Sequence, residues 1–358
     1  MRNKIINSIS VAFVALVALA LIYSCENSIS VDDHSSKLNE NIITLTKSES
    51  DSLSQERPIP GQYIVIFKEQ WQNIRTDQKA EEVRNFTDNF LAEVNIPKDS
   101  VIARFEYALR GFTARMKKDK AENLQNNPAV DYVEQDFLFK AINSVSLITP
   151  PAITTYFNQV TPWGIPRVGG PLDGSFKTAW ILDTGIDLDH QDLNVDTNNS
   201  ASFIAEESAD DLNGHGTQVA GLLAAKNNTI DIVGVAANAI VVSVKVLDKN
   251  GEGSPTSVSS GVDHVVANGS TSDVINMSLG GPISSTIDDA VLNAANMGFR
   301  VSIAAGNEKQ DANNVSPARV EHANVWTVSA FKEDDSFAVS FDCNTISGLI
   351  FPDQPILR

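Results

Sequence analysis

The feature that most constrains the fold is a regular alternation of short apolar runs with helical patterns from Trp163 onward. Val and Ile dominate the apolar runs, which is typical of buried strands. Strands joined through helices run parallel and are covered by helices on both faces. The expected strands are Thr178–Leu182, Ala239–Leu247, Val274–Ser278, Val301–Ala305 and Val325–Ala330, and the expected helices are Thr217–Ala225, Thr256–Ala267 and Ser284–Met297. The pattern therefore predicts an α/β domain built on a parallel sheet.

A smaller domain with a different order of elements precedes this one, over residues 59–141. Its expected strands are Gln62–Phe67, Val101–Tyr107, Gly111–Met116 and Ala129–Glu134, and its expected helices are Thr76–Val94 and Lys118–Asn126. The order β-α-β-β-α-β is typical of a ferredoxin-like α+β domain. This fold alone does not indicate a function.

The first 25 residues resemble an export signal. Arg2 and Lys4 precede an uninterrupted apolar run, Val11–Tyr23, which is shorter than the ~20 residues that a spanning helix needs. Ser24 and Cys25 follow, as in a bacterial lipoprotein cleavage box in which Cys25 would be lipidated. Ordinary signal cleavage and an uncleaved anchor are the alternatives. We expect an exported protein, either a lipoprotein of the bacterial cell envelope attached to the membrane through Cys25 or a secreted protein.

Residues 26–58 are rich in Ser, Asp, Glu and Asn, and they are expected to form a disordered tether. The formal net charge of −18 argues against a nucleic-acid partner, which requires a basic face. Cys25 and Cys343 are the two cysteines of the sequence. If Cys25 carries lipid, no intramolecular disulfide can form, and core size or bound metal must supply the stability.

Two polar residues stand where the predicted sheet would place reactive groups. Asp183 ends an apolar strand, and His215 opens a helix between Gly214 and Gly216. Each alone is more often structural: an aspartate there as a turn or cap residue, a histidine as a packed side chain. Together they can form a base, because a carboxylate fixes the tautomer of a neutral imidazole.

Four motifs in this region resemble the subtilisin family of serine proteases, in family order. They are Asp183-Thr184-Gly185, His215 through Gly221 (HGTQVAG), Asn276 through Gly281 (NMSLGG) and Ala304 through Glu308 (AAGNE). The spacing of Asp183 and His215 is 215 − 183 = 32 residues, as in subtilisin. The resemblance implies a subtilisin-like peptidase domain over residues 158–341, incomplete at its C-terminus.

The resemblance also implies roles for single residues. Asp183 would orient His215, His215 would act as general base and then acid, and Asn307 would donate to the oxyanion. Ser278, Leu279 and Gly280 would pair with the substrate backbone, opposite a second rail at residues 251–256. The resemblance therefore implies protein or peptide substrates, and it implies catalysis without a cofactor.

A structural calcium site is implied by the resemblance as well. The side chains of Gln159, Asp192 and Asn228 and the carbonyls of Lys226, Ile230 and Ile232 match the ligands of a family calcium site. Such an all-oxygen shell suits this cation. Without the resemblance, residues 226–232 are simply a polar loop after a helix.

The smaller domain resembles the inhibitory propeptide of these proteases. Gln62 through Val65, Gly111-Phe112 and Val133 through Asp136 carry the likeness. The chain's own propeptide would then be an intramolecular inhibitor. Residues 142–157, with Pro150-Pro151, would form a linker containing the processing region.

The sequence of residues 1–358 contains no Gly-Thr-Ser-Met-Ala box, which carries the nucleophile in subtilisins. In subtilisin the nucleophile lies about 66 residues after the oxyanion asparagine, which projects to about position 373. Residues 342–358 match no family pattern, as after a frameshift, an assembly break or a true truncation.

Two classes of function therefore compete. One is an exported endopeptidase zymogen whose serine lies outside this sequence. The other is a non-catalytic protein, either a truncated relic or a peptide-binding or inhibitory surface protein. In either case we expect residues 1–358 alone to lack hydrolytic activity.

Overall fold

The computed structural model describes residues 56–68, 77–141, 158–307, 310–330, 334 and 349–350. The expected signal, the tether up to residue 55, the linker and all of the tail except residues 349–350 lie outside these ranges. Cys25 and Cys343 lie outside them as well.

The N-terminal domain is the predicted split motif. Its elements are β1 (Arg57–Phe67), α2 (Asp77–Glu93), η2 (Lys98–Ser100), β2 (Val101–Phe105), β3 (Gly111–Arg115), α3 (Lys118–Gln125) and β4 (Val130–Lys140). The four strands pair antiparallel in the order β4-β1-β3-β2. Phe67, Phe90 and Phe112 pack together where α2 covers the sheet. β1 begins at Arg57, five residues before the expected strand start at Gln62 (62 − 57), and β4 extends six residues beyond the expected strand end at Glu134.

The larger domain has the predicted parallel sheet. Its path is β15-β14-β13-β12-β6-β10-β7, all parallel except the β14–β15 pair. The strands on this path are β6 (Thr178–Asp183), β7 (Asn194–Val195), β10 (Ile240–Lys245), β12 (Val274–Met277), β13 (Arg300–Ala304), β14 (Val325–Ala330) and β15 (Leu349–Ile350). Shorter elements are α4 (Gly164–Arg167), β5 (Leu172–Asp173), β8 (Ala201–Ser202), β9 (Ala236–Ala237), β11 (Glu252–Gly253) and η3 (Ala312–Asn314).

Three helices cover the two faces of this sheet: α5 (His215–Ala224), α6 (Pro255–Asn268) and α7 (Ser285–Asn296). Alternate residues of β6 face opposite cores, because side chains alternate along a strand. Trp180 and Leu182 pack with α6 and α7, whereas Ala179 and Ile181 pack with α5. Fully burying a side chain of the size of Ile181 or Leu182 stabilises the fold by about 1.5–3 kcal/mol.

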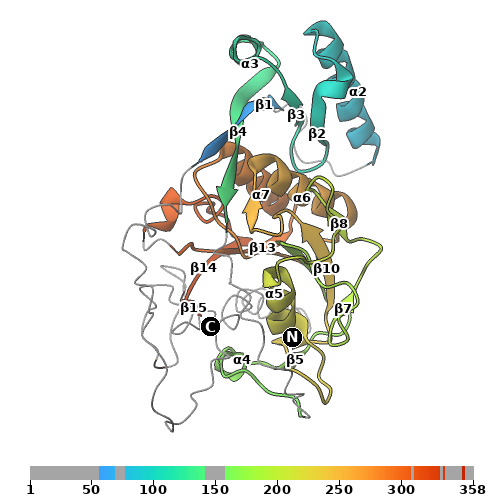
Figure 1. Ribbon diagram of the computed structural model, residues 1–358, viewed down its shortest axis with the longest axis vertical. Helices are drawn as coiled ribbons and strands as arrows, with labels where there is room; N and C mark the ends of the chain where they lie inside the picture. Colours follow the sequence, from blue (N-terminus) through green and yellow to red (C-terminus); the bar gives the residue numbers. More distant parts are fainter. Residues whose placement is uncertain are drawn as a thin grey trace, which may run out of the picture.

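The two domains stack on each other through α6 and α7 (Figure 1). Both helices lie between the parallel sheet on one side and the antiparallel sheet on the other. One hydrophobic cluster joins the domains, since Ile64 and Phe105 pack with Val258 and Val262 of α6. The domain interface is therefore continuous with the core of the larger domain.

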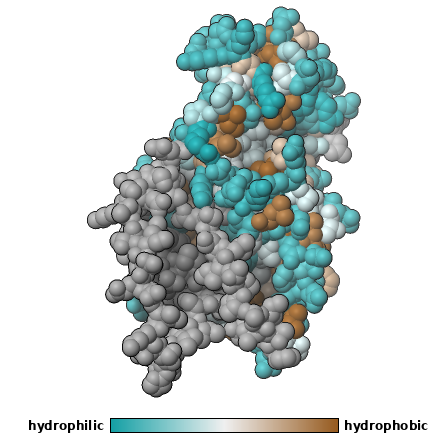
Figure 2. Space-filling view, viewed as in Figure 1, coloured by the Kyte–Doolittle hydropathy of each residue, from teal (hydrophilic) through white to brown (hydrophobic). Residues whose placement is uncertain are grey.

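Most of the described surface that Figure 2 shows is hydrophilic, and apolar residues occur there in small separate groups. Among the described residues, no helix combines the length and the apolar character that crossing a membrane requires. The apolar run Val11–Tyr23 lies outside those residues.

Candidate active site

Asp183 and His215 are brought together at the carboxyl edge of the parallel sheet. Asp183 is the last residue of β6, and His215 is the first residue of α5. His215 Nδ1 lies 2.8 Å from Asp183 Oδ1, which also accepts a 2.7 Å hydrogen bond from the Thr184 amide. Asp183 is fully buried, and 13% of the His215 side chain is exposed. This arrangement leaves Nε2 as the free nitrogen of the imidazole for acid–base chemistry.

The loop before α5 positions the imidazole of His215 at the start of that helix. Gly214 is the N-cap residue with φ 101°, a left-handed conformation that favours glycine. Asp211 accepts hydrogen bonds from the amides of Asn213, Gly214 and Thr217 and from the hydroxyls of Thr184 and Thr217. The carboxylate of Asp211 thus satisfies donors at the start of α5, where negative charge is favoured.

The charges around His215 increase its affinity for a proton. Burial alone would lower the pKa of this imidazole. The charge of Asp183, the hydrogen bond to it and the charge of Asp211 outweigh burial, and together they raise the pKa above its ordinary value of 6.5. For Asp211, burial would raise the pKa, but its hydrogen bonds prevail and lower it.

Asn307 and the segment from Ser278 to Gly280 lie at the same edge of the sheet. β12 and β13 are neighbours and run parallel, and these residues follow their carboxyl ends. Ser278 and Leu279 are buried, and Ser278 Oγ accepts a 2.7 Å hydrogen bond from Asn276 Nδ2. The parallel topology therefore gathers all of these predicted residues on one side of the sheet.

A strand of the N-terminal domain occupies the predicted rail at residues 251–256. The end of β4 pairs antiparallel with β11, with Phe139 opposite Gly253 and Lys140 opposite Glu252. The Ala141 amide donates to the Gly251 carbonyl at 3.0 Å. Phe139 also packs on Gly281, where a side chain would have no space because a ring carbon would lie 2.5 Å from an added Cβ. The chain's own backbone thus adds a strand to this edge.

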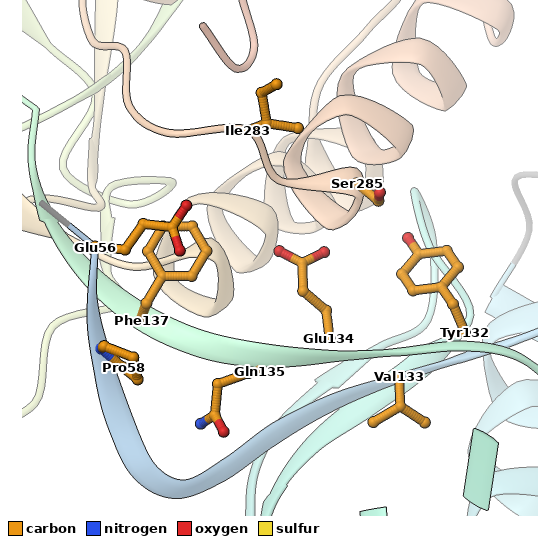
Figure 3. Close-up of a pocket in the computed structure, with 9 residues that line it drawn as sticks. All are labelled: Glu56, Pro58, Tyr132, Val133, Glu134, Gln135, Phe137, Ile283 and Ser285. Atoms are coloured by element: carbon orange, nitrogen blue, oxygen red, sulfur yellow. The ribbon is translucent and has the colours of Figure 1, made fainter. Parts of the chain in front are cut away.

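Two acidic residues of β4 reach the N-termini of α6 and α7. Glu134 accepts from the Ser284 hydroxyl at 2.6 Å and from the Thr286 amide at 2.9 Å, and Figure 3 shows its carboxylate directed toward α7. Asp136 accepts from the Thr256 amide in the first turn of α6. Carboxylates at helix N-termini satisfy unpaired amides and favour the helix dipole.

A third carboxylate crosses the interface in the opposite direction. Asp263 of α6 accepts hydrogen bonds from the consecutive amides of Glu106, Tyr107, Ala108 and Leu109, at 2.6–3.3 Å. Directional bonds as well as apolar packing therefore hold the N-terminal domain in place.

The interface between β4 and the segment before α7 contains a cavity of about 370 Å³, which lies beside Glu134 (Figure 3).

The predicted calcium ligands are largely brought together. Gln159 Nε2 lies 2.6 Å from the Lys226 carbonyl, 3.2 Å from the Ile232 carbonyl and 3.4 Å from Asn228 Oδ1. Asn228 Nδ2 contacts Asp192 Oδ1 at 2.6 Å, and Asp192 Oδ2 is buried with no hydrogen-bond partner among the described residues. The Ile230 amide donates to Asn228 Oδ1, and no contact of its carbonyl is described.

These contacts fit an oxygen-binding cation. The orphaned oxygen of Asp192 and two convergent carbonyls are acceptors, and rotating an amide by 180° exchanges its oxygen and nitrogen. Within the described ranges no three His, Cys, Asp or Glu side chains form a metal cluster. The candidate shell relies on carbonyl and amide oxygens with one carboxylate, which suits calcium better than zinc.

Several further residues of the site have features in the sequence by which they could have been recognised. Lys245 is a charged residue within an otherwise apolar strand, and it is completely buried beside Thr184. Asp211 precedes His215 by four residues in a polar loop. Glu134 and Asp136 lie two residues apart in β4, so both side chains are on the face that points toward α6 and α7.

An Asp–His pair lies at the carboxyl edge of a parallel sheet, and a second domain is docked along the same edge, as expected for a hydrolase held together with an inhibitory domain. The Subtilase family model matches residues 180–352, and the Peptidase inhibitor I9 model matches residues 62–141. The chain is 33% identical over 330 residues to the extracellular serine proteinase of Thermus sp. (strain Rt41A), covering 86% of this chain and 76% of the relative. The chain belongs to the subtilisin-like serine protease family and carries an I9-type propeptide domain.

Other relatives differ in how much of their length is matched. Alkaline serine exoprotease A of Vibrio alginolyticus is 34% identical over 276 residues, which is 73% of this chain and 49% of that protein. The chain thus spans about half the length of the Vibrio relative. The crystal structure of a cold adapted subtilisin-like serine proteinase is 32% identical, covers 53% of this chain and 79% of its own, and has a TM-score of 0.40.

Proposed function

We propose that the protein is the zymogen of an exported endopeptidase that hydrolyses peptide bonds by an Asp-His-Ser mechanism. The 2.8 Å contact between His215 Nδ1 and Asp183 Oδ1 is the observation that carries the proposal. The pairing of β4 with β11 supports it, because an extended peptide lies beside the site in the manner expected of a substrate.

In this proposal each described residue has a defined step. Asp183 holds His215 with the proton on Nδ1, so that Nε2 removes the proton of a serine hydroxyl and later gives it to the leaving amine. Asn307 donates to the oxyanion of the tetrahedral intermediate, a contact worth about 3–4 kcal/mol in such enzymes. The propeptide domain inhibits by occupying the strand position that a substrate requires.

The serine itself is proposed to lie outside residues 1–358, since no Gly-Thr-Ser-Met-Ala box occurs within them. The same observation favours a second candidate function. A chain of these residues alone would be a non-catalytic surface protein, a relic or an inhibitory or peptide-binding module.

Calcium is proposed as a structural ligand, with Gln159, Asp192, Asn228 and the carbonyls of Lys226, Ile230 and Ile232 as its shell. It would hold the segment before α4 against the loop after α5. Catalysis requires no cofactor. The buried, unpartnered Asp192 Oδ2 supports this assignment.

Export is proposed from the apolar run Val11–Tyr23, with attachment to the membrane through a lipid on Cys25 or, alternatively, secretion. The names of relatives such as the extracellular proteinase of Thermus support an exported protein. Mass spectrometry of the membrane fraction, with and without Cys25→Ala, would distinguish these locations.

Hydrolysis of casein by two polypeptides tests the proposed activity. Residues 1–358 alone are expected to show no turnover that a serine-directed phosphonate blocks. A chain extended by the serine box is expected to be active, and His215→Ala should lower its kcat by about 10⁴ or more. Undiminished kcat in that variant would exclude His215 from the mechanism, and phosphonate-sensitive turnover by residues 1–358 would show that their nucleophile was overlooked.

A further inference from the structure

A completely buried lysine lies immediately behind the catalytic pair. Lys245 ends β10, opposite Asp183 in the register of β6, and its side chain has no exposed surface. Its Nζ donates to the Thr184 carbonyl, and Glu207 Oε2 lies 3.0 Å away. Lysine is rarely buried to this extent, because removing an ammonium from water costs several kcal/mol unless the charge is compensated.

A second charge, that of Asp211, lies on the other side of the same threonine. The Thr184 hydroxyl donates to Asp211 Oδ1 at 2.9 Å and accepts from the Gly216 amide at 3.0 Å. The Thr184 amide donates to Asp183 Oδ1. Thr184 therefore connects Lys245, Asp211 and Asp183 through its carbonyl, hydroxyl and amide.

The charges in this cluster do not cancel in pairs. Asp183, Asp211 and Glu207 supply three carboxylates, and Lys245 supplies one ammonium near them. Coulomb interactions are strong in a buried environment, so a cation here opposes the field that the buried Asp183 and the half-buried Asp211 exert on His215.

We propose that Lys245 and Asp211 are positioning residues that set the proton affinity of His215 in opposite directions. Asp211 favours the imidazolium and fixes the loop that carries it. Lys245 disfavours the imidazolium, which keeps His215 available as a neutral base despite the neighbouring carboxylates. The inference deepens the proposed function, on which it rests for the role of His215.

Two other charged residues lie near this edge, and they remain unchanged in every variant of the test described below. Asp187 follows β6, and its amide donates to the Thr217 hydroxyl on α5. Asp210 accepts from the Leu188 amide in the same loop region. Neither contacts Thr184 or Lys245 in the described hydrogen bonds, so Lys245 and Asp211 are the charges to vary.

The test is a proton NMR titration of the histidine C2 protons in the full chain. The sequence has five histidines, and comparison with His215→Ala assigns the signal of His215. Lys245→Met is expected to raise the pKa of His215 by about half a unit to one unit, and Asp211→Asn to lower it by a similar amount. The readout requires no turnover, so failure of the inference is distinguishable from failure of the proposed hydrolysis.

Two controls separate charge from packing. Lys245→Arg keeps the charge and should leave the pKa of His215 near its wild-type value, whereas Lys118→Met removes an exposed lysine of α3 and should have no effect. If Lys245→Met does not fold, Lys245→Gln decides instead, because it also removes the positive charge and should likewise raise the pKa of His215. An unchanged or lowered pKa in Lys245→Met, or in Lys245→Gln where it replaces that variant, overturns the proposal.

Discussion

The distance between His215 and Asp183 depends on the residue that follows the histidine. A Cβ atom on Gly216 would lie 2.0 Å from the Gly185 carbonyl oxygen and 3.2 Å from Asp183 Cβ. Only a residue without a side chain lets the first turn of α5 approach the end of β6 this closely. The geometry of the Asp183–His215 pair therefore depends on this backbone contact as much as on the two side chains.

Gly216→Ala should separate the pair, because the Gly185 backbone cannot yield as a flexible side chain would. We expect a loss of about 1–3 kcal/mol of folding stability, as for other overpacked sites, and a lower pKa of His215. Thermal unfolding and NMR titration measure these effects. Gly221→Ala is the matched control on the same helix, since the nearest atom to its added Cβ is 3.7 Å away, and it should be neutral or stabilising.

The raised pKa of His215 also links its protonation to folding. A histidine whose pKa is higher in the folded state than its unfolded value of about 6.5 adds stability below that value. This contribution disappears as the pH rises through the folded pKa. The melting temperature of the wild-type chain, minus that of His215→Ala, should be larger at pH 5.5 than at pH 8.5. A difference in melting temperature that is larger at pH 8.5 than at pH 5.5 would contradict a raised pKa of His215 in the folded state.

At the scale of elements, β4 connects the two domains most directly. Its residues Glu134 and Asp136 contact the starts of α7 and α6, and its end pairs with β11. Three hydrogen bonds reach the two oxygens of Glu134 from Ser284 and Thr286. This carboxylate acts as a helix cap supplied by a distant part of the chain.

Glu134→Ala should weaken the docking of the propeptide domain. Losing a half-buried carboxylate acceptor costs about 1.5–3 kcal/mol, and the amide and hydroxyls at the start of α7 lose their partner. Amide hydrogen exchange at Thr286 and in the segment from Glu106 to Leu109 should accelerate. Glu122→Ala, on the exposed side of α3, is the control and should leave exchange at these amides unchanged. Equal protection in both variants would show that Glu134 does not help to hold the interface.

Periodicity in the sequence predicted the elements well, because alternation of apolar residues reports burial directly. The parallel sheet and the split motif were both confirmed. The full length of β4 was missed, since its extension is stabilised by partners far away in the sequence. Residues 135–138 lie along β1, and Phe139 and Lys140 pair with Gly253 and Glu252. Asp211 and Lys245 were missed for a similar reason. Their proximity to the Asp183–His215 pair depends on contacts with Thr184 that exist only in the folded chain.

At the scale of the whole molecule, the candidate calcium site joins the start of the larger domain to a loop that follows α5. Ligand binding to the folded state alone stabilises a protein by about 2.7 kcal/mol when the ligand is 100-fold above its Kd. We expect calcium to raise the melting temperature of the full chain and EDTA to reverse the rise.

The same measurement on two aspartate variants locates the effect. Asp192→Asn should abolish most of the calcium-dependent increase, because Asp192 is the carboxylate of the candidate shell. Asp189→Asn changes an exposed residue of the same loop that is outside the shell, and it should keep the increase. A rise that survives in Asp192→Asn would place calcium elsewhere on the chain.

The pairing of β4 with β11 has a consequence for how this protein can change over generations. Glu252 and Gly253 hold the inhibitory strand, and in the proposed enzyme the same two residues would hold each substrate. A substitution there would be subject to selection twice, once for restraint before activation and once for recognition afterwards. A substitution at this edge that weakens binding of the inhibitory strand would also weaken binding of the usual substrates. The inhibitory domain and the substrate specificity of the protease are therefore expected to change together during evolution.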